Sequence, residues 1–128
     1  MKEIDIQIML MQWLKLQYPN VLANASQVLA SAPLKYPKYA AKMKAAGNTS
    51  GWPDITIAEP RGGFHGLYIE LKSEQARVFL KKSGAPDGKH VAKQIAVLEA
   101  LRERGYKAEL CIGLDAAKKV IDDYLLLK

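Results

Sequence analysis

The sequence predicts an α/β fold with a small mixed β-sheet flanked by helices. Three short segments alternate between apolar and polar residues, as strands with one buried face do. These segments are residues 54–58, 66–72 and 106–112. Segments with helical periodicity lie before, between and after them, so the last two strands are expected to be joined by a right-handed parallel crossover. A chain of 128 residues is long enough for one core, and we expect a single domain over residues 1–128.

The first helix is expected at residues 3–17. Its predicted buried stripe consists of Ile4, Ile8, Met11 and Leu14, with Leu10 and Trp13 widening it. These residues recur at helical spacing, and Pro19 lies just beyond the end of the segment. Residues 20–46 contain prolines, serines and asparagines and predict mostly irregular structure. Within them we expect a short strand at 21–25 and a short helix from about residue 36 that ends at Gly47.

The segments at 54–58 and 66–72 are expected to form an antiparallel hairpin. Alternation in the second segment places Glu70 and Lys72 on one face and three apolar residues on the other. A hairpin centred near residue 62 places Asp54 opposite Glu70. Like charges that face each other directly destabilise a hairpin, so either a cation lies between the two carboxylates or the strands pair in a different register.

Two carboxylates with a nearby backbone carbonyl make a hard oxygen site suited to Mg²⁺ or Mn²⁺. Lys72 would place an ammonium near whatever the metal binds. These groups match what phosphodiester hydrolysis needs, because a metal neutralises the phosphate and activates a water while a lysine orients that water or stabilises charge. The same pattern also arises by chance, as polar residues on a solvated strand face.

The second half of the chain completes the predicted sheet. Residues 73–88 are basic and contain glycine and proline, which is typical of a flexible loop. The helix at 89–105 is expected to bury Val91, Ile95 and Leu98, and a final helix is expected at 115–127.

The bulk composition narrows the class of partner. Nineteen Lys and Arg against thirteen Asp and Glu give a net charge of +6, which suits a phosphate-rich partner such as nucleic acid but does not establish one. The single cysteine, Cys111, excludes an internal disulfide and a cysteine-based metal site, and it favours a reducing cytoplasm. No apolar run approaches the ~20 residues of a membrane span, so no membrane partner is expected.

Several lysines are candidates for contacts with a DNA backbone. They are Lys35, Lys38, Lys42, Lys81, Lys82, Lys89 and Lys93. Lysines at helical spacing are also common on solvated faces. His65 and His90 are interpreted as ordinary polar residues, and Trp52 suits packing under the hairpin better than stacking on a base.

The segments Pro53-Asp54 and Glu70-Leu71-Lys72 resemble the core motif of the PD-(D/E)xK nucleases, and the flanking sequence resembles one branch of them, the VRR-NUC family. The matching segments follow the family order along almost the whole chain. They are Glu3 and Gln7 in the first helix, "NVLANAS" (20–26), "GWPDI" (51–55), "GLYIELK" (66–72), Gln94, and Leu101 to Tyr106.

The resemblance implies a restriction-endonuclease-like core and assigns roles to single residues. Asp54, Glu70 and the backbone carbonyl of Leu71 would hold the metal, Mg²⁺ or Mn²⁺, and Glu3 would be a further ligand or support the cluster. Lys72 would be the catalytic lysine, Gln94 would orient it or the water, and Gln7 would support Glu3. Glu3 is also favourable near a helix N-terminus for purely structural reasons, and Gln94 also suits a plain helix surface.

The activity implied is hydrolysis of DNA phosphodiesters by an endonuclease that uses a metal-activated water. Stand-alone members of the family resemble phage-encoded proteins that act in a bacterial cytoplasm and pair into homodimers suited to branched DNA, such as four-way (Holliday) junctions. Two alternatives stay open: a less selective nicking endonuclease, and a basic DNA-binding or assembly module whose triad is inert. Cleavage of RNA also stays possible, because no pattern in the sequence indicates recognition of a 2′-hydroxyl group.

Overall fold

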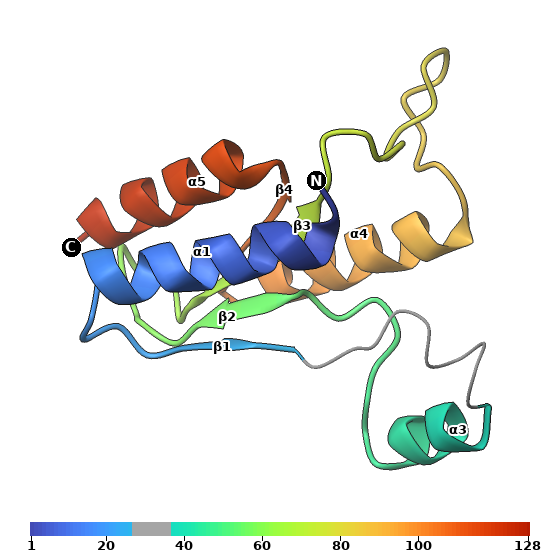
Figure 1. Ribbon diagram of the computed structural model, residues 1–128, viewed down its shortest axis with the longest axis horizontal. Helices are drawn as coiled ribbons and strands as arrows, with labels where there is room; N and C mark the ends of the chain where they lie inside the picture. The colour runs from blue at the N-terminus through green and yellow to red at the C-terminus, as the bar shows by residue number, and fades with distance from the viewer. Residues whose placement is uncertain (27–36) are drawn as a thin grey trace.

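The computed structural model describes residues 1–26 and 37–128, which form a four-stranded mixed sheet with helices on both faces (Figure 1). The elements are α1 (Glu3–Gln17), β1 (Ala23–Ala25), α3 (Pro37–Ala45), β2 (Ile55–Ile57), β3 (Leu67–Lys72), α4 (Lys89–Glu103), β4 (Lys107–Ile112) and α5 (Leu114–Leu126). The predicted α/β class and the predicted order of elements are confirmed. Among the described residues no helix has the length and apolar character needed to cross a bilayer.

The strands lie in the order β1-β2-β3-β4. β1 and β2 are antiparallel, β2 and β3 are antiparallel, and β3 and β4 are parallel with α4 in the connection. In the hairpin Ile55 is paired with Ile69. Asp54 comes directly before Ile55 and Glu70 directly after Ile69, so the register places the two carboxylates opposite each other as predicted.

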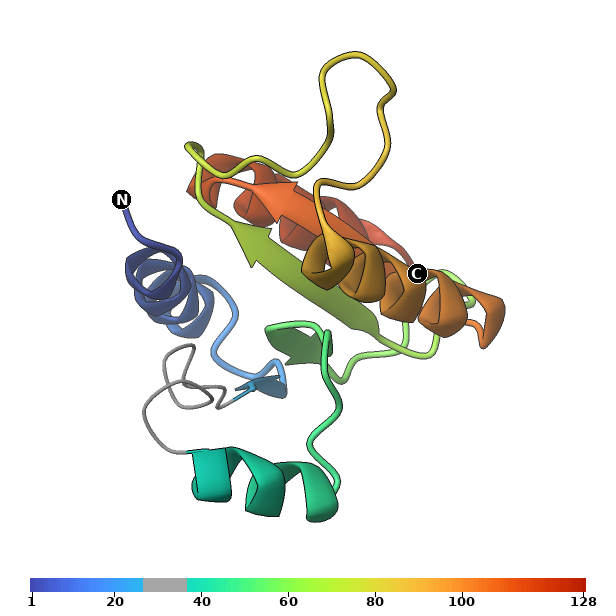
Figure 2. The ribbon, with the colours of Figure 1, turned by 90° about the vertical axis from the view of Figure 1, so that its right-hand side faces the viewer.

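Both faces of the sheet are covered at β3 (Figure 2). On one face Leu67, Ile69 and Leu71 pack against α1 and α5 in the main core. On the other face α4 packs on β4, where Leu98 and Leu101 form a smaller cluster. Glu70 and Lys72 lie on this second face and are buried. The alternative that they sit on a solvated strand face is therefore wrong.

The predicted buried stripe of α1 is partly wrong. The residues that α1 buries are Ile6, Leu10 and Leu14, whereas Ile4 and Ile8 are exposed. The helix is apolar around most of its circumference, so spacing alone admits more than one stripe. In α4 the buried position falls on Gln94 in place of Ile95, which is only half-buried.

Two segments project from the same end of the molecule. Figure 2 looks onto this end and shows α3 below the sheet and the loop of residues 73–88 above it. α3 buries none of its residues, and the loop contains only one isolated bridge, between Phe79 and Pro86. The first turns of α1 and α4 and the end of β3 lie between the two projections (Figures 1 and 2).

Candidate active site

Three carboxylates converge at this end of the sheet. The hairpin register supplies Asp54 and Glu70, and the first turn of α1 supplies Glu3. One carboxylate oxygen from each residue lies within 4.8 Å of the others. Glu3 is exposed, Asp54 is half-buried and Glu70 is buried, so the cluster opens to solvent on the side of Glu3.

Asp54 is held in place from both neighbouring strands. The backbone N–H of Leu71 in β3 donates to Asp54 Oδ2 at 2.8 Å. Ser26, just after β1, donates its backbone N–H to the carbonyl of Asp54 at 2.7 Å and its hydroxyl to the carbonyl of Pro53 at 2.8 Å. These bonds fix the backbone and one carboxylate oxygen of Asp54, so its orientation does not depend on a ligand.

Glu70 is 2% exposed and has one oxygen with partners and one without. Gln94 donates from Nε2 to Glu70 Oε1 at 2.6 Å, and Lys72 Nζ lies 3.8 Å from the same oxygen. Glu70 Oε2 is buried and has no hydrogen-bond partner within the described parts of the chain. A buried carboxylate oxygen without a partner is costly, and such an atom calls for an explanation such as a bound ion.

Burial raises the pKa of Glu70 to about 8, and the charge of Asp54 adds to the rise while Lys72 opposes it. Burial also raises the pKa of Asp54, against the hydrogen bond from the N–H of Leu71. The site therefore resists having both carboxylates ionised unless a positive charge joins them. The hard oxygen donors and the unpartnered Oε2 fit a small divalent cation.

The raised pKa of Glu70 predicts how the stability of the metal-free protein changes with pH. The pKa of Glu70 is 4.5 in the unfolded chain and about 8 in the folded protein. Protonated Glu70 therefore contributes fully to the free energy of unfolding below pH 4.5, and this contribution is lost as the pH rises toward 8. We expect the Tm in EDTA to fall by roughly 10 °C more between pH 5 and pH 8 in the wild type than in Glu70→Gln.

Thermal melts of the two proteins at both pH values test this prediction. If a divalent cation binds the ionised carboxylates, Mg²⁺ should raise the wild-type Tm more at pH 8 than at pH 5. Parallel pH profiles for the wild type and Glu70→Gln would contradict the electrostatic account of the site.

Gln94 and His90 lie on α4 one helical turn apart. Gln94 is 6% exposed and bound to Glu70, so the alternative of a plain surface residue is wrong. His90 is exposed, and its charge lowers the pKa of Asp54 against the effect of burial, which places it near the carboxylates. From the sequence His90 is interpreted as an ordinary polar residue, although its spacing of four residues from Gln94 indicates that both share a helix face.

Most of the remaining predicted residues are lysines on α3, on the loop of residues 73–88 and at the start of α4. The predicted DNA-contacting lysines among the described residues are all exposed, and they are Lys38, Lys42, Lys81, Lys82, Lys89 and Lys93. Lys35 falls within residues 27–36 and lies outside the described residues. No described hydrogen bond joins Gln7 to Glu3. Ligation by the Leu71 carbonyl stays a prediction.

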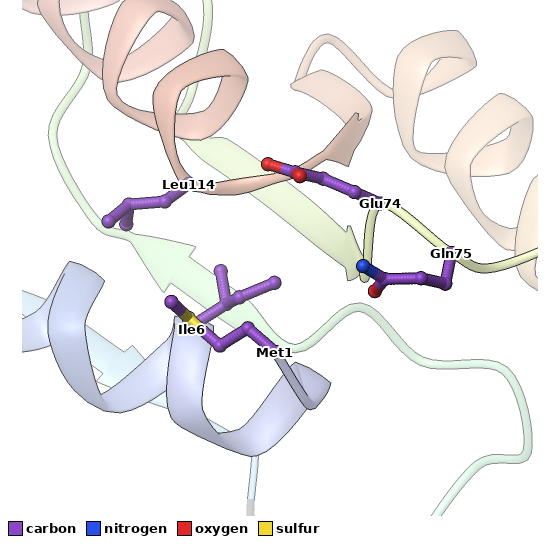
Figure 3. A pocket seen from close by; sticks show the side chains of 5 residues that line it. All are labelled: Met1, Ile6, Glu74, Gln75 and Leu114. Carbon is purple, nitrogen blue, oxygen red and sulfur yellow. The ribbon is translucent and has the colours of Figure 1, made fainter.

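A small cavity of about 70 Å³ lies near the start of α1 (Figure 3). It is lined by Met1, Ile6, Glu74, Gln75 and Leu114. None of the predicted metal or catalytic residues lines it, and it is too small for a nucleotide. The carboxylate of Glu74 packs against Gly113 at the start of α5, where a negative charge is favourable for the helix. The cavity is therefore distinct from the carboxylate cluster.

Comparisons with known proteins show similarity to one family over most of the chain. The family described as the VRR-NUC domain matches residues 1–115. A solved structure described as a VRR-NUC domain protein is similar in fold, with a TM-score of 0.72 and 28% sequence identity. The similarity covers 99% of this chain and 90% of that one. No curated protein matches the sequence significantly.

Proposed function

This chain belongs to the VRR-NUC domain family of nucleases, and we propose that it is a Mg²⁺- or Mn²⁺-dependent DNA endonuclease of the PD-(D/E)xK type. The observation that carries the proposal is the cluster of Glu3, Asp54 and Glu70 with the ammonium of Lys72 beside it. We further propose that residues 1–128 act as one domain in the cytoplasm of a bacterial host.

The proposed roles follow from the contacts of each residue. Asp54 and Glu70 would hold the cation, with Glu3 and the Leu71 carbonyl as further ligands. A divalent cation in this position supplies positive charge to the phosphate and lowers the pKa of a coordinated water. Lys72 stabilises negative charge as it develops on the phosphate oxygens.

Gln94 is a positioning residue in this proposal. Its amide holds Glu70 Oε1 at 2.6 Å, which leaves Oε2 as the oxygen without a partner. The backbone N–H of Leu71 holds Asp54 in a similar way, because it donates a hydrogen bond to Oδ2. Gln94 and Leu71 therefore each hold one carboxylate oxygen of the cluster, and Glu70 Oε2 stays without a partner among the described residues, which preorganises the cluster for a ligand.

The lysines of α3 and of the loop support a path for DNA across the site. Both segments project from the end of the molecule that carries the carboxylates (Figure 2). The first turn of α4 has no acidic residue, and Lys89 and Lys93 are exposed there. This arrangement supplies positive charge on several sides of the cluster, as contacts to a phosphate backbone require.

We expect the double substitution of Lys89 and Lys93 by alanine to weaken DNA binding more at low salt than at high salt. Each lost phosphate contact should reduce the slope of log affinity against log salt concentration by about 1. Fluorescence anisotropy of labelled DNA in Ca²⁺ or EDTA at several salt concentrations measures this slope. Lys15→Ala is the matched control, because Lys15 is exposed near the opposite end of α1 from Glu3. Equal slopes for the double variant and the wild type would contradict the proposed contacts.

A homodimer that cuts branched DNA is the finer part of the proposal. Ile4, Ile8 and Leu16 are exposed on α1, and Leu126 and Leu127 are exposed at the end of α5. Apolar side chains concentrated on two neighbouring helices suit a contact between two copies. Two copies related by a two-fold axis would present two carboxylate clusters to two symmetry-related strands of a four-way junction.

The test of the function is cleavage of junction, flap, duplex and single-stranded DNA with Mg²⁺, with Mn²⁺ and with EDTA. We expect cleavage with either ion, none with EDTA, and the highest rate on junctions. Equal rates on all substrates would contradict the junction preference and favour the alternative of a less selective nicking endonuclease. Absence of cleavage with both ions, alongside retained DNA binding, would overturn the enzyme proposal in favour of a basic DNA-binding module. Matched RNA substrates test the nucleic acid specificity.

A further inference from the structure

Trp52 is a large aromatic residue that stays exposed beside the carboxylate cluster. It is 38% exposed and lies two residues before Asp54. The sequence favours packing under the hairpin, and part of the indole does pack. Its ring meets that of Tyr68 edge to face, with centroids 5.7 Å apart and an interplanar angle of 86°. The rest of the indole is exposed to solvent, although exposing the apolar surface of a tryptophan costs free energy.

The position of Trp52 is fixed by the backbone on both sides. Gly51 adopts φ +81°, and a Cβ built there would lie 3.1 Å from the backbone carbon of Lys93, so this segment packs tightly against α4. On the other side Pro53 is buried and its carbonyl accepts the hydroxyl of Ser26. Tyr68 is itself held by Tyr106, with ring centroids 5.3 Å apart. The indole is therefore presented as a rigid group, which keeps the entropic cost of stacking low.

The surface next to the indole is open and polar. The register places Asn24 beside Thr56 and Thr56 beside Tyr68, so these residues share the sheet face on which Tyr68 and Glu70 lie. Asn24 is exposed and Thr56 is half-buried. Among the described residues this outer part of the sheet face is left uncovered by α4, which contacts β4. The backbone of Lys93 lies close to Gly51, the residue before Trp52, and the Lys93 side chain is exposed.

We propose that the exposed indole of Trp52 stacks on an unpaired nucleobase of the DNA strand that enters the carboxylate cluster. A base within a duplex has both faces covered by its neighbours, so only an unpaired or flipped base offers a face to the ring. Lysines on α4 would hold the phosphates of the same strand. This inference rests on the proposed function, because it takes Asp54 to mark the place where the strand is cut. It deepens that function by naming an unpaired nucleotide, such as a base displaced at the branch point of a junction, as the feature recognised.

Tryptophan fluorescence tests the stacking without any cleavage. The chain has two tryptophans, so Trp13→Phe leaves Trp52 as the only one. In EDTA we expect a short oligothymidylate to quench the fluorescence of this variant, and a blunt duplex of equal length to quench it much less. Equal quenching by the two DNAs, or no quenching by oligothymidylate at concentrations where anisotropy shows binding, would overturn the proposal.

Substitution of Trp52 supplies a second readout. Trp52→Ala should weaken binding of oligothymidylate by about tenfold to a hundredfold, which is the usual effect of removing one stacking aromatic. Trp52→Phe should restore most of the affinity, and both variants should bind a blunt duplex as the wild type does. An equal loss for single strand and duplex, or no rescue by phenylalanine, would show that Trp52 only supports the fold. Because these assays use no divalent metal, they fail or succeed independently of the nuclease activity.

Discussion

Replacing Lys72 by methionine is expected to lower the rate of DNA cleavage roughly 10²- to 10³-fold, the usual cost of removing one group that stabilises transition-state charge. Lys72 is 6% exposed, and its Nζ lies 3.8 Å from Glu70 Oε1, beside the three carboxylates. Methionine keeps the apolar stem that packs in the interior and removes only the ammonium. Single-turnover cleavage of a labelled four-way junction at saturating protein measures the effect on the chemical step.

The affinity of the Lys72→Met variant for DNA should stay within about threefold of the wild type, since one buried lysine adds little to a large phosphate contact. Lys15→Met is the control, because it removes an equal charge from an exposed site. If Lys72→Met cut DNA at the wild-type rate, the lysine would have no catalytic part. If cleavage and binding fell together, its role would be in binding.

The second large effect is expected for Asp54→Asn, which should lower cleavage more than about 100-fold and remove the rise in Tm on adding Mg²⁺. The amide oxygen of asparagine still accepts the N–H of Leu71, so the local structure is retained while the negative charge is lost. Because burial raises the pKa of Asp54, a neutral side chain is tolerated there. We therefore expect the Tm in EDTA to equal or exceed that of the wild type at pH 8.

Cleavage assays and thermal melts with and without Mg²⁺ measure both parts of the Asp54→Asn prediction. Asp123→Asn is the matched control, since Asp123 lies on the surface of α5, where it pairs with Lys119. A Mg²⁺-dependent rise in Tm that survives in Asp54→Asn would place the cation elsewhere.

The hairpin that carries the site was predictable because its constraints are local. Strict alternation in residues 66–72 and the glycines of the turn fix both the faces and the register, and the pairing of Ile55 with Ile69 agrees with them. The rotation of a helix about its axis is set by tertiary packing. For α1, which is apolar on most sides, the periodicity selected Ile4 and Ile8, which are exposed, and omitted Ile6, which is buried.

The candidate site was predictable to the same degree. The spacing of Asp54, Glu70 and Lys72 indicated which side chains share a face, and the family resemblance added Glu3 and Gln94. The burial of Gln94 depends on how α4 docks on the sheet, which no local pattern encodes. The approach of His90 to Asp54 has the same origin. An exposed Trp52 contradicted expectation, since a large aromatic beside a proline is more often packed.

The most direct test of the proposed metal site is anomalous diffraction from crystals soaked in Mn²⁺. We expect an anomalous peak bound by carboxylate oxygens of Asp54 and Glu70, at distances of about 2.0–2.4 Å. Crystals of Asp54→Asn soaked in the same way should show no peak there. A wild-type crystal with no peak at either carboxylate, or with Mn²⁺ bound only elsewhere, would contradict the account.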